Sequence, residues 1–204
     1  MLIAVADLNA AASVMESNYG LTSIEGGRHP GWGTANRILP LGAAYLELVA
    51  VVDRAQATKS AFGSWVAHSS SESPRPLGWA VRTDDLDAVT SRLHLTTARG
   101  SRVARDGRHL RWQLAGVEQA AARPMLPFFI EWGRETPVPG SAPVAHAAGD
   151  VAIHQLQLTG DADELAAWIG EHQIRVSVQP GEPALTGVVL ATTGGEIVLG
   201  DDLL

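Results

Sequence analysis

The sequence predicts an α+β protein built from repeated βαβββ modules, with two modules paired into one cup-shaped sheet and a third at the C-terminus. Three observations support this fold class. A short apolar segment, an Asp-containing turn and an amphipathic helix follow one another three times, starting at residues 3–5, 79–81 and 156–158. Short strand-like runs follow each helix, and in two copies the last run carries a lone glutamate. Repeats of this size indicate pseudo-symmetric modules, so residues in matching places should meet around an axis.

The first module covers residues 1–52. Asp7 is predicted to cap its helix and Gly20 to end it, with an apolar stripe facing inward. Residues 26–33 are so rich in glycine that a loop is expected there. The predicted elements are a strand at 2–6, a helix at about 8–19, and strands near 22–26, 35–41 and 44–52.

A connecting helix and loop are predicted over residues 53–76, because Phe62, Trp65 and Val66 have helical spacing. The second module covers 77–133, and Asp84 or Asp85 caps its helix. Its helix places Leu86, Val89 and Leu93 on one face, and its strands are predicted at 102–105, 109–114 and 128–132.

A linker rich in proline and small residues is predicted over residues 134–150. The third module covers 151–204, with a helix after Asp161 or Asp163 and strands near 174–178, 186–192 and 195–199. One βαβββ unit leaves one face of its sheet open, so it needs a partner. We expect the first two units to pair into a cup, and the third to add a layer or to pair with a second subunit in a homodimer.

Composition excludes several classes of protein. The net charge is −7 and the 15 basic residues are scattered, so a nucleic-acid partner is not expected. The chain has no cysteine, which excludes disulfides and thiolate metal sites. No apolar run is long enough to cross a membrane, and no signal peptide is visible, so a soluble cytoplasmic protein is expected. The first strand begins at Leu2 with no lead-in, so either this strand is short or the chain begins upstream of Met1.

Four segments, RHPGWGTANR at 28–37, YLEL at 45–48, GWAVRTDDL at 78–86 and PFFIEW at 127–132, occur in an informative order. Together with the module plan they resemble the glyoxalase-like domain proteins of the vicinal oxygen chelate superfamily, over roughly residues 1–133. The resemblance implies paired βαβββ modules around a small-molecule site. It leaves the activity open, because that superfamily contains isomerases, dioxygenases, antibiotic-modifying enzymes and plain binders.

The resemblance also bears on cofactors. In metal-dependent members each module offers a ligand on its first strand and a carboxylate on its last. Glu47 and Glu131 match the last-strand positions, whereas the first-strand positions fall just before Met1 and at Gly78, so no histidine is present at either. No cofactor is therefore expected with certainty. Glu47 and Glu131 are weak candidates for a divalent metal, since two carboxylates alone leave the ion short of protein ligands.

Glu47 and Glu131 are the candidate catalytic residues. Each lies in an otherwise apolar strand, and a carboxylate buried there without a partner would be costly. The alternative is that both point to solvent or pair with an arginine. Ionisable groups in clefts mark functional sites, which favours the cup interior. We then expect the two carboxylates to face each other across the cup, with one titrating above an ordinary glutamate.

Candidate ligand-binding residues lie in three places. The glycine-rich segment and the strand after it supply potential hydrogen-bonding groups, and binding groups concentrate on such loops. Tryptophans supply possible stacking walls. The face formed by His109, Arg111 and Gln113 is either solvated or lines the cup, where Arg111 could hold an anion bidentately. The candidates are His29, Trp32, Asn36, Arg37, Trp79, Arg111 and Trp132.

Two functions remain open. The first is a lyase or isomerase in which Glu47 or Glu131 moves a proton next to the carbonyl group of a small carbonyl or aromatic compound. The alternative is a non-catalytic protein of the bleomycin-resistance type that sequesters such a compound in an apolar cup. The chain has no nucleophile elbow, P-loop or dinucleotide fingerprint, which argues against the common hydrolases, kinases and nicotinamide enzymes.

Overall fold

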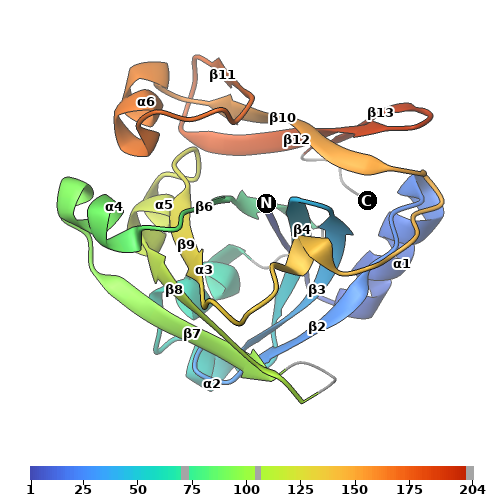
Figure 1. Cartoon of the computed structure of the whole chain (residues 1–204), viewed down its shortest axis with the longest axis horizontal. Coiled ribbons are helices and arrows are strands. Elements are labelled where there is room, and N and C mark those ends of the chain that lie inside the picture. The colour runs from blue at the N-terminus through green and yellow to red at the C-terminus, as the bar shows by residue number, and fades with distance from the viewer. Residues whose placement is uncertain (70–73, 104–106, 201–204) are drawn as a thin grey trace.

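The computed structural model describes residues 1–69, 74–103 and 107–200. These residues form three sheets with helices around them, which confirms the predicted α+β class and the three modules (Figure 1). No helix within this described part has the length and apolar character needed to cross a membrane. The predicted division into residues 1–133, 134–150 and 151–204 stays a prediction.

The first module and one extra strand form a five-stranded sheet, in the order β2-β3-β4-β1-β5. β1 runs parallel to β4, the last strand of the module. Asp7 caps α1 as predicted, because its carboxylate accepts hydrogen bonds from the backbone N–H groups of Asn9 and Ala10 at 2.7 and 2.9 Å. Gly20 ends the helix in the left-handed conformation, with φ at 64°. The elements are β1 (Leu2–Ala4), α1 (Leu8–Tyr19), β2 (Ile24–His29), β3 (Thr34–Leu41), β4 (Ala44–Val51) and β5 (Arg75–Gly78).

The second module forms a four-stranded sheet in the order β6-β9-β8-β7. β6 again runs parallel to β9, the last strand of its module. Helix α5 was not predicted, while the predicted strand over 102–105 partly lies outside the described residues. The elements are α2 (Arg54–Ala57), α3 (Ala61–Ser69), β6 (Ala80–Arg82), α4 (Leu86–Leu93), β7 (Thr97–Val103), β8 (His109–Ala115), α5 (Val117–Ala122) and β9 (Phe128–Trp132).

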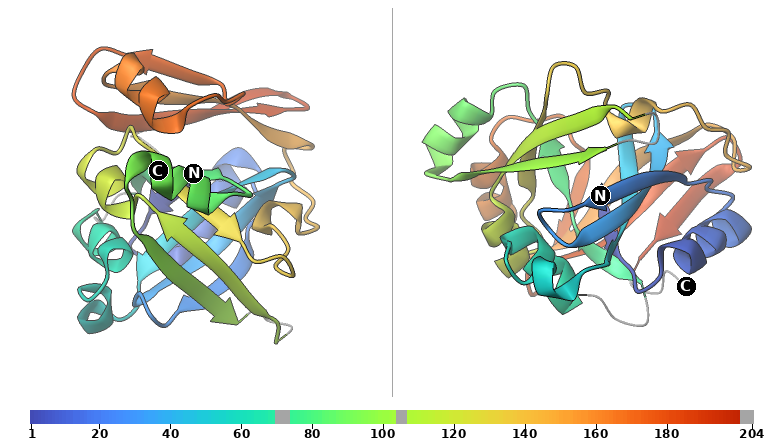
Figure 2. Two further views of the ribbon diagram at one scale, coloured as in Figure 1. Left: turned by 60° about the vertical axis from the view of Figure 1, so that its left-hand side comes forward. Right: turned by 90° about the horizontal axis from the view of Figure 1, so that it is seen from below.

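These two sheets meet at both edges and so form the predicted cup (Figure 2). At one edge the chain passes from β5 to β6 through Trp79. At the other edge β2 lies beside β7, where the Arg102 guanidinium donates to the carbonyl of Gly26. Helix α3 fills the floor of the cup, because Phe62 and Trp65 pack on Phe128 with ring centroids 6.4 and 6.3 Å apart.

The third module has the predicted order of elements but a different pairing of strands. Its sheet runs β11-β10-β12-β13, so the first strand pairs in parallel with the strand directly after the helix, not with the last strand. A polypeptide can thus repeat the βαβββ order without repeating the sheet. The elements are β10 (Val151–Thr159), α6 (Ala162–Ile169), β11 (Val176–Gln179), β12 (Ala184–Thr192) and β13 (Gly195–Leu199), after a short 3₁₀ turn, η1 (Pro139–Ser141).

This third sheet lies across one end of the cup as a separate layer (Figures 1 and 2). It shares one hydrophobic core with α1 and with the outer face of the first sheet. Polar contacts fix it to the second module as well. Arg92 of α4 donates to the carbonyls of Ala167 and Trp168 at 2.9 Å, and the Trp168 indole donates to the carbonyl of Pro127 at 2.8 Å. The third module therefore packs on both halves of the cup.

The glycine-rich loop predicted over residues 26–33 is shorter in the structure. β2 continues through Gly26 and Gly27 to His29, and only the next four residues turn. Gly26 is required there, since a Cβ atom would overlap the side-chain amide of Asn36 on the neighbouring strand. Gly27 has φ at 134° beside a bulge in the pairing of β2 with β3. Gly26 and Gly27 thus allow a bulged strand to form, and glycine content alone does not distinguish such a strand from a loop.

Candidate functional site

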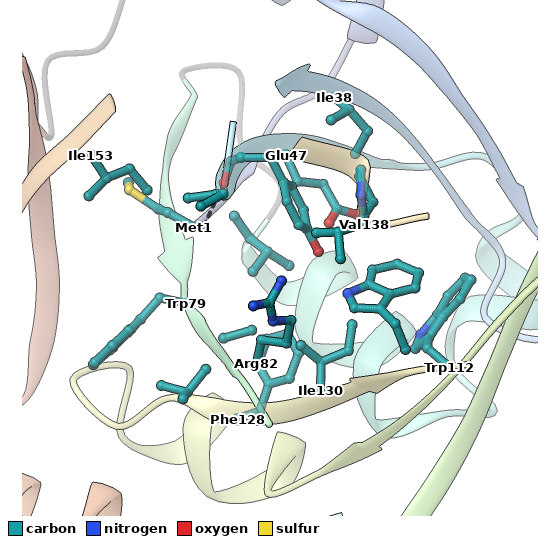
Figure 3. A pocket seen from close by; sticks show the side chains of 18 of the residues that line it. Met1, Ile38, Glu47, Trp79, Arg82, Trp112, Phe128, Ile130, Val138 and Ile153 are labelled. Carbon is teal, nitrogen blue, oxygen red and sulfur yellow. Dashed lines mark hydrogen bonds between the residues drawn. The ribbon is translucent and has the colours of Figure 1, made fainter. Parts of the chain in front are cut away.

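A cavity of about 610 Å³ lies inside the cup. The walls come from both cup sheets, from the linker, and from the third module through residues of β10 and the segment 173–175. Figure 3 shows Glu47 on one side and Phe128 and Ile130 on the other. The aromatic residues that line the cavity are Trp32, Tyr45, Phe62, Trp79, Trp112, Phe128 and Trp132.

Glu47 reaches this cavity from β4. Its carboxylate accepts a hydrogen bond of 2.8 Å from the side-chain amide of Asn36, which lies on the adjacent strand β3. Burial raises the pKa of Glu47 above its usual value, and this effect exceeds the opposing effects of the Asn36 hydrogen bond and of the positive charges of the Met1 amino group and Arg102. A carboxylate with a raised pKa holds a proton more readily than a glutamate in water does.

Asn36 is positioned by the backbone beneath it. Its side-chain oxygen lies against Gly26, and among the described residues this buried oxygen has no hydrogen-bond partner. The amide nitrogen is therefore the atom that faces the cavity side, where it donates to the carboxylate of Glu47 and orients it. Asn36 was predicted to bind ligand; the structure places it in the cavity lining and directly on Glu47.

Two further polar side chains belong to this wall. Arg102 reaches in from β7 and is buried, and burial lowers the pKa of its guanidinium. Tyr45 lies two residues before Glu47 on β4, and burial together with the charge of Glu47 raises the pKa of its phenol. Both residues line the cavity. Glu47, Asn36, Tyr45 and Arg102 form what we call the polar wall.

His29 is a buried part of the lining. Its Nδ1 lies 3.0 Å from the hydroxyl of Thr34, and its ring centroid lies 5.6 Å from that of Trp32 and 5.7 Å from that of Trp112. Burial, and secondarily the charge of Arg102, lowers the pKa of His29 to about 3. The imidazole is therefore neutral near pH 7, and it packs as one more ring among the tryptophans.

Glu131 does not join Glu47, so the prediction that the two carboxylates face each other is wrong. The Glu131 carboxylate accepts a hydrogen bond of 2.8 Å from the backbone N–H of Leu86, the first residue of α4. On the same strand Ile130 and Trp132 line the cavity, and Glu131 is not among the lining residues. Because side chains alternate along a strand, Glu131 points to the opposite face, where it stabilises the N-terminus of a helix.

The backbone hydrogen bonds show which residues correspond between the two modules. The N–H of Glu47 donates to the carbonyl of Met1 at 2.9 Å, and the N–H of Phe128 donates to the carbonyl of Trp79 at 3.1 Å. The strand registers agree, since Leu2 pairs with Glu47 and Ala80 with Phe128. Phe128, three residues before Glu131, is therefore the counterpart of Glu47.

This correspondence shows which residues of the two modules could share a metal ion. Leu2, Glu47, Ala80 and Phe128 lie at the same level of the two ladders, in place of the pair Glu47 and Glu131 that the resemblance implied. Three of these four side chains offer no ligand atom. Within the described residues no group of three histidine, cysteine or acidic side chains could hold a metal ion. The residues present do not fit a divalent ion. Glu47 lines the cavity and Glu131 points to the other face of its strand, so the two carboxylates cannot bind the same ion.

The other predicted ligand-binding residues divide into two groups. Trp32 and Trp132 line the cavity, as does Trp79, whose indole donates to the carbonyl of Met125 at 3.0 Å. Arg37 does not line it, because its guanidinium donates to the hydroxyl of Ser23 at 2.9 Å. Arg111 is likewise outside: Leu110, Trp112 and Leu114 face inward on β8, which leaves Arg111 exposed on the other side.

Six polar residues of the lining were missed, namely Tyr45, Arg82, Arg102, His154, Gln173 and Arg175. Tyr45 could have been found, because it lies two residues before Glu47 and so shares its face of the strand. The three arginines follow no local pattern. Their convergence depends on how β6, β7 and the third module pack together.

Comparisons with known proteins agree with this fold. A family model described as a glyoxalase-like domain matches residues 1–173, which confirms the family resemblance of the sequence. A hypothetical protein from Staphylococcus aureus has a similar structure, with a TM-score of 0.62, 14% identity, and coverage of 97% of this chain and 82% of that chain. This likeness shows the fold alone.

Weaker structural similarity is found with two methylmalonyl-CoA epimerases. The enzyme from Mycobacterium tuberculosis has a TM-score of 0.44 and 20% identity, over 68% of this chain and 85% of that chain. A variant of the Streptomyces coelicolor enzyme in complex with 2-nitronate-propionyl-CoA has a TM-score of 0.45 and 18% identity, over 68% and 94% of the two chains. No curated protein matches the sequence.

Proposed function

Because the chain belongs to the glyoxalase-like domain family, we propose that it is a lyase or isomerase that acts on a small carbonyl or aromatic compound. In this proposal Glu47 removes or returns a proton on the carbon next to the carbonyl group. The aromatic lining holds the rest of the molecule. No step is assigned to a metal, since Glu47 is the one carboxylate among the corresponding residues Leu2, Glu47, Ala80 and Phe128.

The observation that carries this proposal is the half-buried carboxylate of Glu47, which lines the cavity and is oriented by Asn36 at 2.8 Å. A general base works best when its pKa lies near the working pH. Burial shifts the pKa of Glu47 upward, which is the direction that makes a carboxylate a stronger base. Proton transfer near a carbonyl leaves negative charge on oxygen, and the positive charge of Arg102 in the same wall favours that charge.

The walls determine what kind of molecule fits. The ring centroid of Trp112 lies 5.6 Å from that of Trp32 and 5.2 Å from that of Trp132, so three indoles form one continuous aromatic surface. Such surfaces bind flat apolar groups by stacking and by burial of area. A volume of about 610 Å³ is in the usual range for small-molecule sites.

The same apolar walls favour a second candidate, a protein that sequesters an aromatic compound without reaction. The two functions differ in one respect only, which is whether Glu47 transfers a proton. The cytoplasmic location and the homodimer predicted from the sequence stay predictions.

Hydrogen exchange distinguishes the two functions. We would incubate the protein with phenylpropanedione in deuterium oxide and follow the methyl hydrogens next to its carbonyl by NMR. Catalysed exchange that is lost in Glu47→Gln supports the enzyme. Binding with no catalysed exchange supports the sequestering protein. Glu131→Gln is the matched control, because that carboxylate lies outside the cavity on the other face of its strand.

A further inference from the structure

The charged side chains of the cavity do not follow the charge of the chain. The whole sequence has 22 acidic and 15 basic residues, for a net charge of −7. Among the described residues that line the cavity, Glu47 is the only carboxylate, while Arg82, Arg102 and Arg175 contribute three guanidinium groups. The cavity of this acidic protein therefore contains more positive than negative side chains.

The three arginines differ in what they already contact. Arg102 is engaged by the carbonyl of Gly26 and lies close enough to Glu47 for the two charges to interact. Arg175 has one nitrogen 3.4 Å from Nδ1 of His154. The side chain of Arg82 makes no hydrogen bond or ion pair within the described part of the chain. Arg82 is thus the guanidinium whose five donors are available to a ligand.

The position of Arg82 directs it to the cavity. Ala80, Val81 and Arg82 of β6 all line the cavity, and Val81 also packs against the neighbouring hydrophobic core. Arg82 pairs in register with Ile130 of β9. Figure 3 shows its side chain extending into the pocket from the wall that carries Phe128 and Ile130, with Glu47 on the opposite wall.

The comparison between modules gives a second reason to single out this residue. By the same register that matches Glu47 with Phe128, Arg82 corresponds to Ala4 of β1, which is fully buried. The first module closes this place with a methyl group. The second module places a cation there, beside the aromatic wall and across from the base.

We propose that the ligand of this cavity is a small organic anion, whose carboxylate or comparable acidic group is held by Arg82 while the carbon next to its carbonyl group faces Glu47. This inference rests on the proposed function and adds the substrate class. The guanidinium fork matches a carboxylate with two parallel hydrogen bonds, which favours a planar acid over a neutral group of the same shape. Cations gathered in a cleft also raise the local concentration of an anion.

Two probes of nearly the same shape test the proposal by isothermal titration calorimetry. Phenylglyoxylate carries a carboxylate where phenylpropanedione carries an acetyl group. We expect wild-type protein to bind phenylglyoxylate at least about tenfold more tightly than phenylpropanedione, the size of one charge-assisted contact. Arg82→Met keeps the apolar stem of the side chain, and we expect it to remove this preference by weakening the anion about tenfold while leaving the neutral probe within about twofold.

Arg111→Met is the control, because Arg111 is exposed on the outer face of the same sheet and should change neither affinity. Equal binding of the two probes to wild-type protein, or equal losses in Arg82→Met and Arg111→Met, would overturn the anion site and leave the proposed function standing. Absence of binding by both probes at millimolar concentration would overturn both. Anion binding that persists in Glu47→Gln, with hydrogen exchange lost, would support both and separate binding from proton transfer.

Discussion

The two halves of the cup are alike in backbone and different in chemistry. At the same place in the hydrogen-bond ladder, β4 carries Glu47 and β9 carries Phe128. The first module thus supplies Glu47, Asn36 and Tyr45 to the cavity. The second module supplies Arg82, Arg102 and an aromatic wall made of Trp112, Phe128 and Trp132. Pairing two modules shapes a cavity, but it does not place the same functional group twice.

The lone glutamate of the second module shows the other side of this comparison. Glu131 lies three residues after Phe128 and therefore points to the opposite face of its strand. There its carboxylate accepts the N–H of Leu86 and complements the positive end of α4. One residue type, in two similar apolar strands, acts as a candidate base in one module and as a helix-stabilising group in the other.

The largest expected effect comes from making the second module resemble the first. Phe128→Glu should destabilise the protein by about 3–5 kcal/mol, because it removes a buried ring and places a second carboxylate in an apolar wall. Urea denaturation measures this loss, and Phe128→Leu is a milder control of similar burial. A Phe128→Glu variant as stable as wild type would contradict this prediction. So would a variant whose stability is restored by added zinc, because the cup would then accommodate two carboxylates.

The next effect concerns the base itself. Glu47→Gln should lower catalysed hydrogen exchange by about 100-fold or more, the usual contribution of a general base. In wild-type protein the exchange rate should rise with pH, with a midpoint above the ordinary glutamate pKa of 4.5, since only the ionised carboxylate accepts a proton. A pH profile of the exchange rate measures this midpoint, and a rate independent of pH from 4 to 8 would contradict the role of Glu47.

The same substitution has a predicted signature in stability. A carboxyl group whose pKa is raised by folding stabilises the fold below its unfolded pKa, and that contribution is lost as the pH rises through the folded pKa. Glu47→Gln should therefore be more stable than wild type near pH 7, and this gain should vanish below about pH 4.5. Thermal denaturation at the two pH values shows the sign. A variant less stable than wild type near pH 7 would mean that the Asn36 contact outweighs burial.

His29 affects stability in the opposite pH direction, and its effect near pH 6 is small because it builds up only as the pH falls toward 3. Its pKa is lowered from 6.5 to about 3, so the stability that it contributes is present above pH 6.5 and is lost as the pH falls toward 3. Wild-type protein should lose up to about 1.4 kcal/mol per pH unit more than His29→Gln over this window. Denaturation curves at several pH values measure the slope. His109→Gln, which changes an exposed side chain, should keep the wild-type slope.

The smallest effect comes from Glu131. Glu131→Ala should lower the free energy of unfolding by about 0.5–1 kcal/mol, because the N–H of Leu86 loses a charged acceptor at a partly exposed helix end. Hydrogen exchange on phenylpropanedione should be unchanged. A loss of exchange as large as that of Glu47→Gln would restore the symmetric two-carboxylate site that the structure contradicts.

The order of elements along this chain follows from local properties of the sequence. Asp7 and Asp161 cap helices where the sequence predicts them, and the hydrophobic periods place α1 and α4 within a few residues, whereas β7 begins at Thr97, well before the strand predicted at 102–105. These features were predictable because capping and amphipathic spacing depend on residues close together in the chain. The prediction that Glu47 is a site residue rested on the same kind of pattern, a charge within an apolar strand.

Tertiary structure decided everything that depends on which face of a strand points inward. Period-two alternation separates the two faces of β9, but only its pairing with β6 shows that Phe128 faces the cavity and Glu131 faces α4. The same holds for the third sheet, where β10 pairs with β11, and for the arginines brought together from separate elements. Register and packing come from contacts between residues far apart in the chain, and a single sequence carries no local signal of them.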